Sequence, residues 1–165
     1  MKERFIWEEL IRVMKTKLRK PFSCYLLIFL QFFLGLGSLF GGGALILSPD
    51  GSLLRMPLEV LQYSPFQSYL IPGIILFVGL GVYPVFTAIF LITKKPMKAF
   101  ETICFDKETH WSWNSSLYIG FILIIWITVE VYMLRGVGFL HVFYIFLGLA
   151  IQAVTVLPSV KRYYS

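Results

Sequence analysis

The sequence predicts an all-α integral membrane protein, a bundle of four helices that each cross a bilayer. Of its 165 residues, 58% are hydrophobic and only 15% are charged, and the mean hydropathy is +0.76. A soluble domain carries roughly 25% charged residues. Long stretches of the sequence contain almost no charged residue, and lysine and arginine cluster in alternate segments between these stretches. We therefore expect one compact membrane domain with no second folded unit.

Four stretches are long enough for the helix of about 20 residues that crosses a bilayer. They cover residues 22–47, 66–93, 113–134 and 137–160. The first has no charge and is too long for the apolar core of a signal peptide. An outer loop, 48–65, and a cytoplasmic loop, 94–112, connect the stretches, and residues 161–165 form a tail.

Lysine and arginine counts predict the orientation. Thirteen of these residues lie in 1–21, 94–112 and 161–165, whereas Arg55 and Arg135 are alone in the other two loops. The positive-inside rule then predicts a multi-pass protein of the plasma (inner) membrane with both termini in the cytoplasm. No basic surface is interleaved with stacking aromatics, which excludes nucleic-acid binding.

Two shorter helices are expected outside the spans. Residues 2–18 place Ile6, Leu10 and Met14 on one apolar stripe opposite the charges, which is typical of a helix lying at the cytoplasmic membrane surface. In the outer loop, Pro57 suits the first turn of a short helix that caps the bundle. Its apolar face would carry Leu54, Leu58 and Leu61, and Arg55 would pair with Glu59 four residues on. The tail KRYYS is expected to be an interfacial anchor.

Glycines and prolines predict how the spans pack. Because lipid is as apolar as leucine, membrane helices associate through small residues, and Gly37 and Gly41 form such a face. We expect this face to meet Gly79 and Gly81 of the second span. Pro84 removes a backbone donor and is expected to kink that span.

Glu130 is the one carboxylate inside a predicted span. It lies four residues before Leu134, or about 6 Å from the outer end of its helix. We expect it to pair with Arg55, Arg135 or His141, of which His141 falls at the same depth in an antiparallel hairpin. Three roles stay open: a structural pair, a ligand or ion site, or a side chain that reaches the headgroups.

Gln31 and Gln152 form a second expected polar layer. Both fall in the inner half at similar depth, where amides hydrogen-bond across helices. We interpret them as an interhelical contact, although two polar layers could equally be steps of a conduction path.

No catalytic or metal-binding pattern is present. The sequence lacks a Ser-His-Asp set, paired carboxylates, HExxH, a P-loop and CxxC. His110 and His141 fall on opposite sides of the membrane, and neither Cys24 nor Cys104 has a partner at ligand spacing. We therefore expect no metal, no cofactor and no structural disulfide.

Several short motifs carry a resemblance. They are Pro49, Gly51 to Leu54, Pro57-Leu58, Leu61, Pro65-Phe66, Leu70 to Gly73, Leu157-Pro158 and Arg162-Tyr163. With the glycine-rich end of the first span, they resemble a family of small bacterial four-span membrane proteins with no assigned activity. Similarity to DoxX-like proteins is architectural only. The resemblance implies a fold and a location.

The leading functional hypothesis is a non-enzymatic membrane protein. It is either an accessory partner of another membrane protein or a binder of a small hydrophobic or lipid-like molecule in the bilayer. A small transporter or ion pathway using Glu130, possibly as a homo-oligomer, is the alternative. A lipid-modifying enzyme is the weakest, because Glu130 has no catalytic partners.

Overall fold

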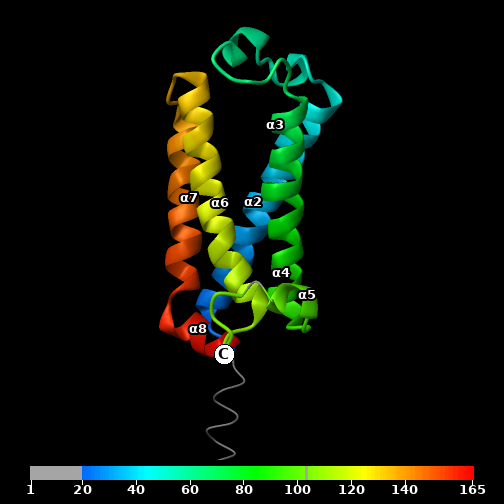
Figure 1. Ribbon diagram of the computed structural model, residues 1–165. Coiled ribbons are helices and arrows are strands. Elements are labelled where there is room, and N and C mark those ends of the chain that lie inside the picture. The colour runs from blue at the N-terminus through cyan, green and yellow to red at the C-terminus, as the bar shows by residue number, and fades with distance from the viewer. Residues whose placement is uncertain (1–19, 103) are drawn as a thin grey trace, which may run out of the picture.

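The computed structural model describes residues 20–102 and 104–165, and this part of the chain is helical without strands. Long helices run side by side between two ends (Figure 1). We call them the cap end, formed by residues 48–69, and the terminus end, where the C-terminus lies. The amphipathic helix expected at 1–21 lies almost wholly outside the described residues.

The long helices are α2 (Phe22–Leu47), α6 (Trp111–Leu134), α7 (Phe139–Thr155) and a composite rod of α3 (Leu70–Ile75), η3 (Leu76–Val82) and α4 (Tyr83–Thr93). Three of them, α2, α6 and the rod, are long and apolar enough to cross a membrane. There are four if α7 and the bent segment after it count as one span. The first predicted span matches α2 in both bounds.

The predicted kink at Pro84 takes another form. The segment before it, η3, is a π-helix, and the N–H of Tyr83 reaches back to the carbonyl of Val78. Pro84 has no backbone N–H to donate, and this wider turn accommodates the missing hydrogen bond. The rod therefore continues to Thr93 as one helix that is long and apolar enough to cross a membrane, although it begins at Leu70 rather than at residue 66.

The fourth predicted span is broken. α7 ends at Thr155, and α8 (Pro158–Tyr164) leaves it at 63°. Leu157 has the extended ψ of 134° that a following proline favours, so the helix cannot continue through it. The helix expected over 137–160 is therefore divided near its inner end, and it forms one span only if the bent pair is counted together. In the tail, Tyr164 is 3% exposed and donates through Oη to the Leu91 carbonyl at 2.7 Å, whereas Lys161 and Arg162 are exposed.

The cap is built from short 3-10 turns, η1 (Ser52–Leu54) and η2 (Leu58–Leu61), instead of one α-helix. Leu54 and Leu61 pack against Leu45 and Tyr69, but Leu58 is exposed. Arg55 ends η1 with a φ of 54°, and the described residues contain no Arg55–Glu59 ion pair. The cap is held by Tyr69, which bonds the carbonyls of Pro49 and Pro57.

Glycines do bring α2 against the rod, but in a different set from the one predicted. A Cβ on Gly35 would lie 3.0 Å from the Gly81 carbonyl, and one on Gly42 would lie 2.8 Å from that of Gly73. Gly79 has nothing within 4 Å. Gly37 and Gly41 face elsewhere, into the space described next.

Candidate functional site

A cavity of about 420 Å³ lies between α2, η3, α6 and α7 toward the cap end. We call it the cap-end cavity. In Figure 1 the α6–α7 pair stands apart from α3 at this end and meets α4 near the other. The wall of the cap-end cavity is mostly apolar. It consists of Gly37, Ser38, Gly41, Met56, Leu76, Leu80, Leu123, Trp126, Ile127, Glu130, Leu134, Gly138, Phe139, Leu140, His141 and Tyr144.

The cavity exists because α2 presents its smallest side chains there. Gly37, Ser38 and Gly41 share one helical face, and a Cβ added to Gly41 would still be 3.7 Å from the nearest atom of Leu76. Opposite them, Leu76 and Leu80 belong to the π-helical segment. Such segments occur frequently at functional sites.

Glu130 lies on the α6 face that lines the cavity, with Ile127 and Leu134 on the same face. It also borders a smaller cavity of about 40 Å³ beneath the cap. The carboxylate is half-buried, yet among the described residues it has no hydrogen-bond partner and no cation nitrogen within 4.0 Å. The expected ion pair of Glu130 is therefore absent from the described residues.

His141 does face the same cavity, as the antiparallel hairpin predicts. Its Nδ1 accepts a hydrogen bond of 2.8 Å from the Gly138 N–H and so caps α7. This bond leaves Nε2 as the nitrogen that carries the proton of the neutral ring. Among the described residues, His141 and Glu130 line the same cavity but form neither a hydrogen bond nor an ion pair with each other.

The two arginines lie elsewhere. The Arg135 guanidinium sits 5.3 Å from the ring centre of Tyr63 and 5.6 Å from that of Tyr132. Such stacking is favourable for a guanidinium. Arg55 does not line the cavity.

Three other polar or aromatic groups in the cavity escape sequence reasoning. Ser38 is 4% exposed and has no hydrogen-bond partner among the described residues. Trp126 and Tyr144 add an indole and a phenol to the wall. The signal was present in the α6 pattern, because Trp126 lies one turn before Glu130 and shares its face.

The floor of the cavity is closed. Leu80 and Leu123 line it and are each 1% exposed, and Leu34 behind them is 0% exposed. These leucines belong to one buried core that continues toward the terminus end.

Gln31 and Gln152 do not form the expected hydrogen bond. Both amide atoms of Gln31 and the Nε2 of Gln152 are buried without a partner, as is the Thr87 hydroxyl. Gln152 instead packs against Gly120, where an added Cβ would approach its side chain to 2.5 Å. The expected hydrogen bond between the two amides is therefore absent from the described residues, although Gln152 does contact a neighbouring helix.

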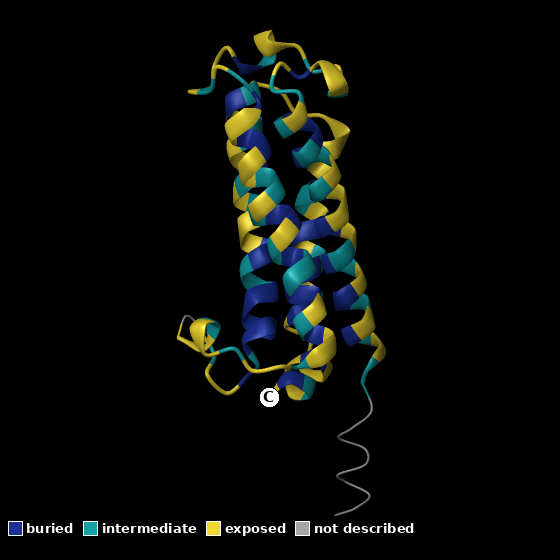
Figure 2. Cartoon of the chain, turned by 90° about the vertical axis from the view of Figure 1, so that its right-hand side faces the viewer, coloured by how far each residue is buried: buried dark blue, intermediate teal, exposed yellow. Residues whose placement is uncertain are grey.

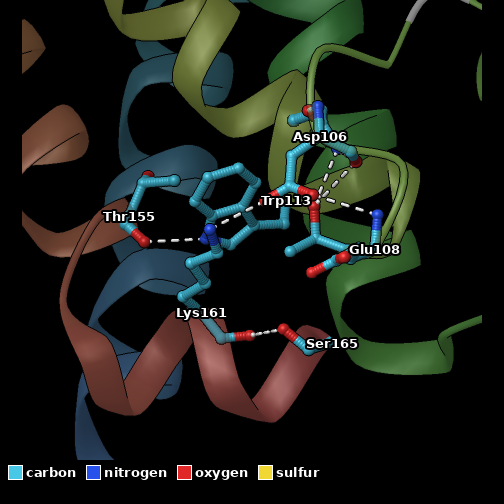
Figure 3. Close-up of polar contacts among 8 residues, drawn as sticks. Asp106, Glu108, Trp113, Thr155, Lys161 and Ser165 are labelled. Atoms are coloured by element: carbon cyan, nitrogen blue, oxygen red, sulfur yellow. Dashed lines mark hydrogen bonds and ion pairs between the residues drawn. The ribbon is translucent and has the colours of Figure 1, made fainter.

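Polar contacts hold the segments at the terminus end together (Figure 3). The indole N–H of Trp113 donates to the Thr155 carbonyl at 2.8 Å, and Lys161 pairs with Asp106 at 2.8 Å. The hydrogen bond from Lys161, aided by the Glu108 N–H, holds the pKa of Asp106 below its ordinary value. Nearby, Lys94 donates to the Tyr163 carbonyl and lies 3.3 Å from the centre of that ring.

The described residues offer no cluster of side chains that could hold a metal ion. No group of three histidine, cysteine or acidic side chains converges in this part of the chain. Cys24 and Cys104 are free thiols. The chemistry available at the cap-end cavity is therefore apolar contact, one carboxylate and several hydrogen-bond donors. Searches of protein-family models, curated proteins and solved structures find nothing that matches this chain.

Proposed function

We propose that this chain is an integral membrane protein that binds a small hydrophobic or lipid-like molecule in the cap-end cavity without catalysing a reaction. The observation that carries the proposal is the cavity itself, about 420 Å³ with an apolar wall and a few polar groups. Ligand sites typically have volumes of roughly 300–1,000 Å³ and this composition.

Residence in a bilayer is supported by the outward faces of the long helices. Exposed residues follow these faces along their length (Figure 2), and many are large and apolar, including Phe29, Leu36, Ile125 and Phe146. A water-soluble protein rarely exposes apolar patches of this extent. The lysines and arginines of residues 1–21, 94–112 and 161–165 support a cytoplasmic location for both termini, because the positive-inside rule favours that side for them.

Binding accounts for the cavity better than conduction does. A transport pathway needs polar groups along a continuous route, but Leu34, Leu80 and Leu123 separate the cavity from the buried glutamines. A role solely as an accessory partner would leave the internal volume unexplained. A pocket with one closed end suits a molecule that enters and leaves by the same side.

The test measures saturable binding of tritiated decanol to the protein in phosphatidylcholine nanodiscs, with empty discs subtracted. Gly41→Leu fills the cavity from α2 and should abolish the saturable component. Gly79→Leu is the matched control, because Gly79 also has open space at its Cβ but does not line the cavity. Ser38→Leu is a second filling variant in case Gly41→Leu is poorly folded.

Saturable binding in the wild type and in Gly79→Leu, lost in the filling variants, is the expected result. Absence of a saturable component in wild-type protein would overturn the proposed function. So would equal binding by the wild type and a well-folded filling variant.

A further inference from the structure

We propose that the ligand of the cap-end cavity is a single-chain amphiphile with a cationic ammonium head that pairs with Glu130. This inference rests on the proposed binding function and names its ligand class. It is carried by the charge, the aromatic lining and the volume of the cavity.

The charge of the cavity is unbalanced. Among the residues that the structure describes, Glu130 has no ion-pair partner, and no lysine or arginine belongs to the wall of the cavity. His141 commits Nδ1 to the Gly138 N–H, and Arg135 stacks on Tyr63 and Tyr132. A carboxylate away from water needs a cation or hydrogen-bond donors. A ligand cation supplies what the described side chains do not, whereas an anionic head would meet a like charge.

The aromatic residues favour the same head group. Trp126, Phe139 and Tyr144 line the cavity together with Glu130. The faces of aromatic rings attract ammonium groups, and tryptophan does so best. Indole, phenol and carboxylate in one pocket therefore select an ammonium over an uncharged alcohol.

The volume limits the ligand to one chain. About 420 Å³ corresponds to roughly 14 water molecules at about 30 Å³ each. A two-chain phospholipid is far larger, whereas a decyl chain with a trimethylammonium head is of that size. Glu130 and His141 lie near the cap end and Leu80 and Leu123 form the floor, so the head points toward the cap and the chain toward the leucines.

The experiment displaces tritiated decanol from wild-type protein in phosphatidylcholine nanodiscs with three unlabelled competitors below their micelle concentrations. Decyltrimethylammonium carries a positive charge that does not depend on pH, decanol is its neutral counterpart, and decyl sulfate is anionic. We expect the cation to compete at least about 10-fold more strongly than decanol, or about 1.4 kcal/mol. Decyl sulfate should be the weakest of the three.

Glu130→Gln keeps the shape of the side chain and should abolish the preference, so that the cation and decanol compete equally. Glu59→Gln removes an exposed cap carboxylate outside the cavity and should keep the preference. Decanol binding without preference for the cation in the wild type would overturn this inference and leave the proposed function standing. If the wild-type protein shows no saturable decanol binding at all, the proposed function is overturned, and this inference with it.

Discussion

A close backbone contact between α2 and the rod predicts a sharp difference in stability between substitutions at two neighbouring glycines. A Cβ on Gly42 would lie 2.7 Å from the Phe77 nitrogen, 2.8 Å from the Gly73 oxygen and 2.9 Å from the Phe77 Cα. All three are backbone atoms, so no side-chain rotation relieves the overlap. A Cβ on Gly43 would instead meet the edge of the Phe77 ring at an ordinary 3.7 Å.

Gly42→Ala and Gly43→Ala therefore form a matched pair. Both gain the same advantage of alanine over glycine in a helix, about 0.8–1.0 kcal/mol, so it cancels in the comparison. What remains is the cost of forcing packed backbones apart, about 1–3 kcal/mol. For a chain of this length, that corresponds to a melting temperature about 2–12 °C lower for Gly42→Ala.

Thermal unfolding of both variants in one mild detergent measures the difference, and SDS titration checks it by an independent route. Gly43→Ala should unfold about 2–4 °C above the wild-type protein, because it keeps the helix advantage of alanine without an overlap. If Gly42→Ala were as stable as Gly43→Ala, the close approach of α2 to the rod would be refuted. The walls of the cap-end cavity would then need another arrangement.

Three further predictions concern polar groups. Asn114 bonds the N–H and carbonyl of Asp106 and the Thr109 hydroxyl. Asn114→Ala should therefore lower the free energy of unfolding by about 1–3 kcal/mol for each buried group left unpaired. SDS titration measures this loss, and an unchanged midpoint would contradict it. Lys161 lowers the pKa of Asp106, so their pairing stabilises the fold above the unfolded Asp pKa of about 3.9 and is lost as pH falls through the lower folded value. Thermal unfolding of Asp106→Asn should therefore show less acid sensitivity than wild type, and equal sensitivity would speak against the pair. Gln31→Leu should stabilise the protein by about 1–3 kcal/mol in SDS titration, because two unpaired buried amide atoms disappear; destabilisation would mean that Gln31 has a partner.

Hydropathy predicted the helical class and the bounds of α2 but not the breaks in other helices. Pro21 precedes α2, and Ser48-Pro49 follows it, so local chemistry and apolar length agree there. At Pro158 they disagree: the apolar stretch continues to Val160, but the backbone before the proline is extended. Local backbone chemistry ended α7 despite favourable composition on both sides.

The sequence predicted where the residues of the candidate site lie better than it predicted which contacts they form. Depth along antiparallel helices is enough to bring Glu130 and His141 to one level, and both line the cap-end cavity. Whether they form an ion pair depends on rotation about each helix and on competing bonds, such as the one from Gly138 to His141. Ser38 illustrates the remaining difficulty: a small residue packs a helix where a partner is close and opens a cavity where none is.

The surroundings of Glu130 and Gln31 distinguish a side chain that can bind a ligand from one that only lowers the stability of the fold. Both lack a hydrogen-bond partner among the described residues. Gln31 is 0% exposed within the core, so its unpaired amide has no space to bind a molecule. Glu130 borders two cavities, and the larger has room for a head group and its chain. An unpaired polar group in close packing only lowers stability, whereas one that faces open volume can recover that free energy from a ligand of opposite charge.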